Sequence, residues 1–333
     1  MLKILVTGGL GFIGSNFITH ILSKHPNKEI VNIDKIGLGA NLENLKDLKK
    51  EDRYHFIKAD TSNPQALNGI IEDCDGVINF AAETHVDRSI ADPKPFLESN
   101  TIGTFNLLET ERKLNKPIRH VQISTDEVYG DIPQGCFREE DRLKPSNPYS
   151  ASKAAADMLC QAYHRTYGLD IIITRCTNNF GPYQFPEKLI PKTIIRAQKN
   201  LPIPIYGTGK NIRDWIYVLD HCEAIDLTLR EGKPGETYNI SSGNELSTIT
   251  TVKKILEMLG KPENLIAFVE DRPGHDLRYS LDSSKIRKEL GWKPRHAFES
   301  ALVKTVEWYT KNESWWKPIA TNEILHPTPW KMN

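Results

Sequence analysis

The chain has 333 residues and carries 43 Lys+Arg and 43 Asp+Glu, so its formal net charge is zero. This balance gives no reason to expect a nucleic-acid partner or attachment to an acidic membrane surface. No apolar run approaches the roughly 20 residues that a membrane-spanning helix requires. The first residues, Met1–Thr7, lead at once into a glycine-rich stretch, which is typical of a first strand and not of a signal peptide.

The cysteines argue against both a disulfide framework and a zinc site. They are five in number, scattered, and contain no C-x-x-C pair. This usage fits a reducing compartment, so we expect a cytoplasmic protein without a bound metal.

The first half of the chain alternates short apolar runs with helical stretches, the pattern of a parallel sheet built from βαβ units. The expected strands are Lys3–Thr7, Ile30–Asp34, His55–Asp60, Gly76–Ala82, His120–Thr125 and Asp170–Arg175. The expected helices between them are Ile13–Ser23, Pro64–Glu72, Pro93–Leu114 and Ser150–Tyr167. The strands are rich in Val and Ile and mostly lack alternation, as expected when helices cover both faces of the sheet.

After about residue 178 the alternation becomes irregular and prolines interrupt the pattern. Helices are expected here at Thr251–Leu259, Ser284–Leu290 and Phe298–Thr310. We therefore predict a Rossmann-type, doubly wound parallel sheet over residues 1–177. A smaller, interleaved α/β substrate-binding lobe follows over residues 178–333, with a soft boundary and a cleft between the two.

A glycine loop directly after the first strand indicates a dinucleotide site. Gly8, Gly11 and Gly14 would allow a tight turn, close approach to a pyrophosphate and close packing of the next helix on the sheet. The phosphates would lie at the N-terminus of that helix, where free N–H groups favour negative charge. The spacing is G-x-x-G-x-x-G, so it meets the G-x-G-x-x-G fingerprint only in part, and a plain tight turn is the alternative.

The ends of the next strands supply further cofactor candidates. Asp34, twenty residues beyond Gly14, can bind the ribose hydroxyls and would repel a 2′-phosphate, which favours NAD over NADP. The neighbouring Lys35 could soften that preference. Asp60 is a candidate for the adenine edge, although a strand-end turn explains it equally well.

A tyrosine and a lysine four residues apart, Tyr149 and Lys153, would lie on one face of a helix. There the ammonium would lower the pKa of the phenol from its usual value of about 10, so that the phenolate could accept a proton from a sugar hydroxyl. Upstream, Thr125-Asp126-Glu127 follows an expected strand and adds an acid and a base, which favours elimination in addition to oxidation. Each motif has a plain alternative: a packed helix-surface pair for the first, and a helix N-cap for the second.

Together these motifs resemble the extended short-chain dehydrogenase/reductase superfamily and, within it, the nucleotide-sugar 4,6-dehydratases. The resemblance runs from about Lys3 to Tyr309. Its segments are Ala81–Ser89 (AAETHVDRS), Ser124–Gly130 (STDEVYG), Tyr149 with Lys153, Asn178–Pro182 (NNFGP), Phe185–Leu189 (FPEKL), Arg213–Trp215 (RDW) and Asp271–Asp276 (DRPGHD).

The resemblance implies a reaction in three steps on a nucleotide-linked glucose, with dTDP as the expected carrier and UDP or GDP as alternatives. Tyr149, assisted by Lys153 and by Thr125, would remove the C4 hydroxyl proton while hydride passes to NAD. Glu127 would then take the C5 proton and Asp126 would protonate the departing C6 hydroxyl, before hydride returns from NADH to C6. A 4-epimerase or a decarboxylase on the same fold is the main alternative, and a non-catalytic NAD-binding protein is a second one.

The resemblance also implies the binding residues. The expected cofactor-binding residues are Gly8, Gly11, Phe12, Ile13, Gly14, Asp34, Lys35, Asp60, Thr61, Ala81, Ala82, Ser99, Ser124, Tyr149, Lys153 and Asn178. The expected substrate-binding residues are Thr84, His85, Thr125, Asn179, Glu187, Lys188, Leu189, Pro204, Tyr206, Arg213, Asn244, Arg272 and His275. Among the latter, Arg213 and Arg272 are the expected diphosphate clamp, because a guanidinium matches phosphate bidentately.

Some features depart from the family pattern. Phe180 and Gln184 replace the more usual tyrosine and histidine, and Thr84 replaces a serine but keeps its hydroxyl. A C-terminal tyrosine that contacts substrate in relatives has no evident counterpart, so the Trp-rich tail is not expected to bind substrate. A homodimer is implied, in which the helices near Pro93–Leu114 and Ser150–Tyr167 pair into a four-helix bundle.

Overall fold

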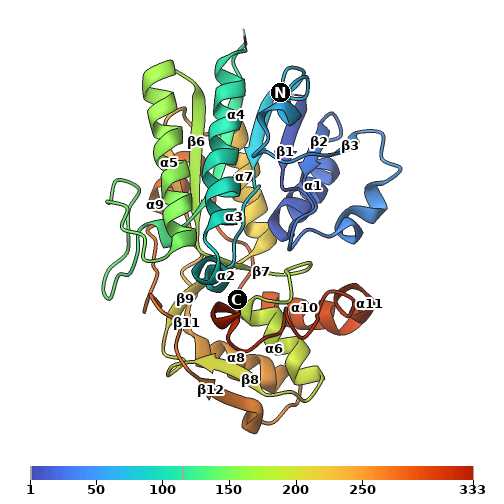
Figure 1. Cartoon of the computed structure of the whole chain (residues 1–333), viewed down its shortest axis with the longest axis vertical. Coiled ribbons are helices and arrows are strands. Elements are labelled where there is room, and N and C mark those ends of the chain that lie inside the picture. The colour runs from blue at the N-terminus through green and yellow to red at the C-terminus, as the bar shows by residue number, and fades with distance from the viewer. Residues whose placement is uncertain (1, 115, 333) are drawn as a thin grey trace.

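The structure is a computed structural model that describes residues 2–114 and 116–332. Its centre is a seven-stranded, fully parallel sheet in the order β10-β6-β5-β4-β1-β2-β3 (Figure 1). The strands are β1 (Lys3–Thr7), β2 (Glu29–Asp34), β3 (Tyr54–Lys58), β4 (Gly76–Asn79), β5 (Arg119–Thr125), β6 (Asp170–Cys176) and β10 (Thr237–Ile240). The direction of winding reverses between β1 and β4, where open α/β sheets bind their ligands. The predicted Rossmann-type fold is confirmed.

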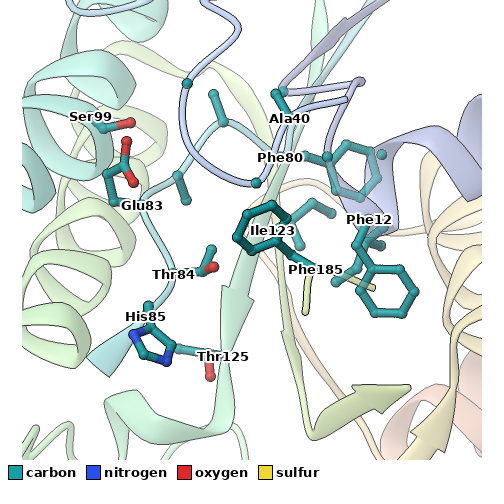
Figure 2. Close-up of a pocket in the computed structure, with 18 of the residues that line it drawn as sticks. Phe12, Ala40, Phe80, Glu83, Thr84, His85, Ser99, Ile123, Thr125 and Phe185 are labelled. Atoms are coloured by element: carbon teal, nitrogen blue, oxygen red, sulfur yellow. The ribbon is translucent and has the colours of Figure 1, made fainter. Parts of the chain in front are cut away.

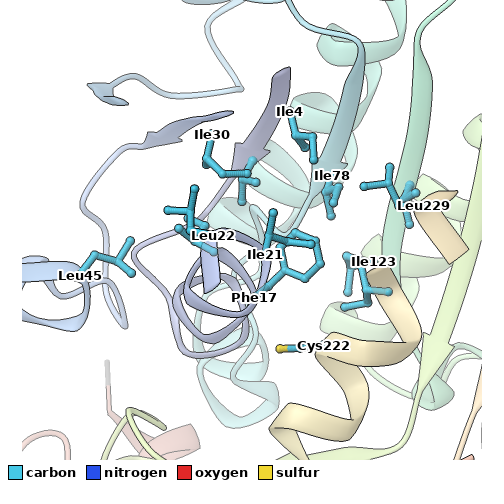
Figure 3. Packing of buried hydrophobic residues seen from close by; sticks show 14 of the residues in the cluster. Ile4, Phe17, Ile21, Leu22, Ile30, Leu45, Ile78, Ile123, Cys222 and Leu229 are labelled. Atoms are coloured by element: carbon cyan, nitrogen blue, oxygen red, sulfur yellow. The ribbon is translucent and has the colours of Figure 1, made fainter. Parts of the chain in front are cut away.

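Helices cover both faces of this sheet. One face is covered by α1 (Phe12–Lys24) and α7 (Val218–Glu231), and the other by α4 (Gly103–Arg112) and α5 (Pro148–Tyr167). Figure 3 shows the core under α1 and α7, where Phe17, Ile78 and Leu229 meet with no solvent exposure. Because α7 and β10 come from the second half of the chain, the two halves interleave in the same sheet.

The second lobe lies below the carboxyl ends of the sheet in Figure 1. It contains a three-stranded sheet of β7 (Asn178–Phe180), β9 (Ile212–Tyr217) and β11 (Glu245–Ser247), and a parallel pair of β8 (Ile203–Tyr206) and β12 (Ile266–Val269). Its main helices are α6 (Leu189–Gln198), α8 (Thr248–Met258), α10 (Phe298–Lys311) and α11 (Glu313–Trp316). Phe180, Trp215, Phe298 and Tyr309 form the centre of its core.

The remaining helices are short. They are η1 (Leu42–Leu48), η2 (Pro64–Leu67), α2 (Val86–Ala91), α3 (Lys94–Phe96), η3 (Leu97–Ile102), η4 (Asp126–Val128), η5 (Glu263–Leu265), α9 (Ser284–Leu290) and η6 (Pro329–Lys331). In the part of the chain that the structure describes, no helix is both long enough and apolar enough to cross a bilayer.

Five expected elements were wrong in extent. Two differ by a few residues, since α8 starts at Thr248 and not at Thr251, and β3 ends at Lys58 and not at Asp60. The other three differ more in kind or in length. The helix expected at Pro64–Glu72 is only a 3-10 turn over Pro64–Leu67, and Gly69 follows it with a φ of +76°. The strand expected at Gly76–Ala82 ends at Asn79. The single helix expected over Pro93–Leu114 is divided into three consecutive elements, namely α3, the π-helical turn η3 and α4. Such π turns often lie at functional sites.

Candidate active site

A cavity of about 280 Å³ lies beyond the carboxyl ends of the central strands. Figure 2 shows Glu83, Thr84 and His85 along one side, and Phe12 and Phe80 along the other, with Ile123 between them. Every residue expected to bind the cofactor lines this cavity, and so do all five expected catalytic residues. Catalytic and cofactor candidates from eight separate segments therefore converge on one site.

The glycine loop has the geometry that a pyrophosphate requires. Gly8 has a φ of +67°, and a Cβ there would lie 2.7 Å from the backbone nitrogen of Ala81. A Cβ on Gly14 would lie 2.6 Å from the carbonyl oxygen of Gly8. Helix α1 starts after Gly11 without a side-chain cap, so its first N–H groups are available to an anion. These residues fit a bound dinucleotide.

Asp34 is held at the end of β2 by the backbone. Its Oδ2 accepts a hydrogen bond from the Leu10 N–H at 3.1 Å and its Oδ1 accepts one from the Ile36 N–H at 2.8 Å. Lys35 does not leave a free cation beside it, because the Lys35 Nζ lies 3.0 Å from Glu83 Oε1. This arrangement favours NAD, since a 2′-phosphate would meet a carboxylate and an already paired ammonium.

Asp60 makes the hydrogen bonds of a strand-end turn and also lines the cavity, and its contact with the adenine edge stays a prediction. Its Oδ1 accepts hydrogen bonds from the Ser62 N–H at 2.9 Å and the Ser62 hydroxyl at 2.8 Å, as in a strand-end turn. It nevertheless lines the cavity, together with Thr61 and with Ser99 from the π turn.

Tyr149 and Lys153 stand on the buried face of α5, which starts with a capping box between Asn147 and Ser150. The expected lowering of the Tyr149 pKa is wrong for this arrangement. Burial raises the pKa of Tyr149, and the negative charges of Glu127 and Asp126 raise it further. The Lys153 ammonium donates to the Ile123 carbonyl at 2.5 Å, and burial lowers its own pKa.

The carboxyl pair follows β5 in the short helix η4. The Thr125 hydroxyl caps this helix by accepting from the Glu127 N–H at 3.3 Å, and it donates to Asp126 Oδ1 at 3.1 Å. Thr125 therefore caps η4 and lines the cavity at the same time. Asp126 Oδ2 is buried and has no hydrogen-bond partner within residues 2–114 and 116–332.

The surroundings push the pKa values of the two carboxyl groups apart. Burial raises the pKa of Asp126 well above its usual range, and the charge of Glu127 adds to this. Burial also raises the pKa of Glu127, but the cations of Arg272, Arg213 and Lys188 act in the opposite direction. The arrangement therefore favours a protonated Asp126 beside an ionised Glu127, as an acid and a base require.

The expected substrate residues divide into two groups. Thr84, His85, Thr125, Asn179, Glu187 and Lys188 line the cavity. Within this group, Lys188 Nζ donates to the Thr84 carbonyl at 2.7 Å, and Glu187 pairs with Arg88 at 3.0 Å.

The second group lies outside the cavity, in the smaller lobe. It consists of Leu189, Pro204, Tyr206, Arg213, Asn244, Arg272 and His275. The Arg213 guanidinium lies 4.3 Å from the ring centre of Tyr279, whose hydroxyl is 3.5 Å from Glu127 Oε2. Tyr279 therefore connects this group to the carboxyl pair.

Sequence reasoning missed several residues of the site. His221 lines the cavity, and its Nδ1 lies 2.9 Å from Asn179 Oδ1. No local signal marks it, because a lone histidine in a helix is usually structural. Tyr279 could have been found, since it follows the family-like segment Asp271–Asp276 by three residues.

The C-terminal tail also lies closer to the substrate group than expected. The Trp330 ring packs edge-to-face on Tyr206, with their centres 4.7 Å apart. Two residues of α6 hold the segment before it: Lys192 donates to the His326 carbonyl at 3.2 Å, and Arg196 donates to the Leu325 carbonyl at 2.8 Å.

The comparisons with known proteins agree with this geometry. The model of a family described as GDP-mannose 4,6 dehydratase matches residues 5–305. A dTDP-glucose 4,6-dehydratase from an Actinoplanes species is 46% identical over 320 residues, covering 95% of this chain and 100% of that protein. This chain belongs to the dTDP-glucose 4,6-dehydratase family.

Similarity to solved structures supports the same family. The dTDP-glucose 4,6-dehydratase of Streptomyces venezuelae, with NAD and TYD bound, superposes with a TM-score of 0.93 at 43% identity, covering 96% of this chain and 100% of that one. A UDP-glucuronic acid 4-epimerase from Bacillus cereus shares the fold, with a TM-score of 0.88, but only 27% identity over 93% of this chain and 99% of that one. The family membership thus separates the chain from the epimerases that share its architecture.

Proposed function

We propose that this member of the dTDP-glucose 4,6-dehydratase family converts dTDP-glucose to dTDP-4-keto-6-deoxyglucose with NAD as its cofactor. The observation that carries the proposal is the buried pair Asp126 and Glu127, whose pKa values are pushed apart in one cavity with Tyr149. An oxidation and re-reduction at C4 alone would need no such pair.

NAD, when bound, supplies the acceptor that takes hydride from C4 and later returns it to C6. The glycine loop would hold its pyrophosphate at the start of α1, and Asp34 would hold its ribose. The residues of the chain do the proton chemistry around this transfer.

In the first step the Tyr149 phenolate takes the proton of the C4 hydroxyl, which the Thr125 hydroxyl orients, and becomes a phenol. Because burial raises the pKa of Tyr149, this phenolate is a strong base, and Tyr149 must lose its own proton before the step. Lys153, fixed on the Ile123 carbonyl, is the cation that would stabilise the phenolate until it takes the sugar proton.

In the second step the C4 ketone acidifies the C5–H bond, and Glu127 removes that proton. Asp126, kept protonated by burial, gives its proton to the C6 hydroxyl, which leaves as water. Glu127 then returns a proton to C5 as hydride is delivered to C6, which completes the 4-keto-6-deoxy sugar. The burial of both groups favours these transfers, because bulk water does not compete at the site.

Incubation with dTDP-glucose and measurement of the 4-keto product, which absorbs in alkali, tests the proposal. We expect a keto product with dTDP-glucose at a kcat/KM well above that with UDP- or GDP-linked glucose. A stronger reaction with one of the latter would correct the carrier, and a C4 epimer without a ketone would replace the dehydratase assignment. Absence of product from all three would contradict catalysis altogether.

We also propose a cytoplasmic homodimer built on α4 and α5. The support is exposed apolar surface on these two helices: Met158 of α5 is 62% exposed and Phe105 of α4 is 39% exposed. Two copies of this helix pair would cover these side chains in a four-helix bundle. Light scattering of the chain should give twice the monomer mass, and a monomer mass would refute the dimer.

The free cysteines support the reducing compartment.

A further inference from the structure

Asp87 lies in the short helix α2 of the cofactor-binding half, yet its carboxylate contacts the other lobe. Its Oδ1 accepts a hydrogen bond from Arg272 at 2.8 Å, and its Oδ2 accepts one from the Tyr206 hydroxyl at 2.8 Å. The residue is only 2% exposed. Each oxygen of this carboxylate thus fixes one residue of the smaller lobe.

The charge of Asp87 is maintained by these contacts. Burial alone would raise its pKa, but His85, Arg272 and Tyr206 together hold the pKa of Asp87 at about 2. Asp87 is therefore ionised at neutral pH and forms a buried ion pair with Arg272. Pairs of this kind fix the geometry of both groups.

Arg272 has donor capacity left over. Its Nε is buried and has no hydrogen-bond partner among the described residues, while its Nη1 is taken by Asp87. A buried guanidinium N–H without an acceptor is costly, so this edge of Arg272 suits an incoming anion. A phosphate accepts two parallel hydrogen bonds from such an edge.

The same short helix also contacts the catalytic tyrosine. The Ser89 hydroxyl accepts a hydrogen bond from the Tyr149 N–H at 3.2 Å, and Val86 packs against the Tyr149 side chain. Helix α2 therefore connects the base of the first chemical step to the residues that Asp87 holds.

We propose that Asp87 is a positioning residue of the substrate site, which orients Arg272 for the diphosphate of the nucleotide sugar and fixes Tyr206 beside it. This inference rests on the proposed function, because it takes the ligand to be a nucleoside diphosphate sugar. Asp87 touches neither the sugar nor the reacting atoms; it acts through Arg272.

The isosteric variant Asp87→Asn tests this, with Asp92→Asn as its matched control. Asp92 follows the same helix, is exposed, and its side chain accepts a hydrogen bond from the Lys94 N–H. We expect Asp87→Asn to raise the KM for dTDP-glucose about tenfold, as for loss of one charge-assisted hydrogen bond, with kcat changed by less than about threefold. Asp92→Asn should leave both constants unchanged.

Ligand binding separates positioning from a general structural role. Calorimetric titration of Asp87→Asn should show weaker binding of dTDP but unaltered binding of thymidine, because only the former offers a diphosphate to Arg272. Equal losses for dTDP and thymidine, or no loss for dTDP, would overturn the proposal. The titration needs no turnover, so it still tests Asp87 if the chain fails to dehydrate dTDP-glucose.

A double-mutant cycle with Arg272→Gln completes the test. In the Arg272→Gln background the Asp87→Asn change should have little further effect on dTDP affinity, and a full, additive loss would contradict the proposal. Should Asp87→Asn fail to fold, Asp87→Glu retains the charge but displaces Arg272 by one methylene. That variant should also weaken dTDP and spare thymidine, and wild-type dTDP affinity would again count against the proposal.

Discussion

The cofactor side and the nucleotide side of this molecule are built in different ways. Most residues expected to bind the cofactor follow the ends of parallel strands, while Ser99, Tyr149 and Lys153 come from helices, and one cavity gathers all of them. The nucleotide-side residues come from separate strands and loops, and they contact one another, as in the pair Asp87 and Arg272, which are 185 positions apart. A parallel sheet brings its strand ends to one edge automatically, whereas the second site depends on long-range pairs of side chains.

The largest fall in kcat should follow substitution of Tyr149, on the cofactor side. Tyr149→Phe removes the phenolic proton acceptor and should lower kcat by about 10³-fold, within the range of general acid–base catalysis. Binding of dTDP should be retained, because Tyr149 is not among the residues expected to bind the nucleotide sugar. Single-turnover measurement of hydride transfer gives the rate. A loss below tenfold would remove Tyr149 as the base of the first step.

Glu127→Gln should lower kcat by about 10²-fold, because elimination loses its base. The variant should still oxidise C4, but exchange of the C5 proton with solvent should disappear. Nuclear magnetic resonance in heavy water measures this exchange. Asp126→Asn serves as the comparison, since it should retain C5 exchange while losing release of water; retained exchange in Glu127→Gln would assign the base elsewhere.

The pH dependence of activity involves both the carboxyl pair and Arg272 on the nucleotide side. Activity should rise with pH as Glu127 loses its proton and fall again as Asp126 loses its own, because both carboxyl groups have raised pKa values and Asp126 must stay protonated. Arg272 lowers the pKa of Glu127, so Arg272→Gln should move the acidic limb of kcat to higher pH. An acidic limb unchanged in that variant would show that Arg272 does not act on Glu127.

The smallest change in KM is expected from a substitution in the C-terminal tail. Trp330→Ala removes the ring that packs on Tyr206 and should raise the KM for dTDP-glucose about fivefold, since an aromatic contact contributes about 1 kcal/mol. Trp315→Ala is the control, because Trp315 packs on Trp308 and Tyr183 instead. Steady-state kinetics with matched melting temperatures would distinguish them, and equal KM values would separate the tail from substrate binding.

The sequence was sufficient for the features that local patterns encode. Gly8, Asp34 and the Tyr149–Lys153 spacing are each defined by a few neighbouring residues, and the parallel sheet follows from the apolar runs. The features that the sequence did not predict depend on which groups the fold places around a residue. The Tyr149 pKa rises because the site is buried and the two carboxyl groups lie close, which no spacing in the sequence reveals.

The same holds for the smaller lobe. Asp87 lay within a family-like segment, but its partners Arg272 and Tyr206 are distant in sequence, so its role required the fold. The π turn in the expected helix Pro93–Leu114 is likewise a local change of hydrogen bonding that periodicity does not record.

The central claim is that hydride leaves C4 and returns to C6 while Asp126 and Glu127 remove water. Incubation of the enzyme with dTDP-glucose deuterated at C4, followed by nuclear magnetic resonance of the product, tests it most directly. We expect deuterium in the C6 methyl group of the 4-keto product, with no net consumption of NAD. Deuterium found again at C4, in a product without a ketone, would contradict it.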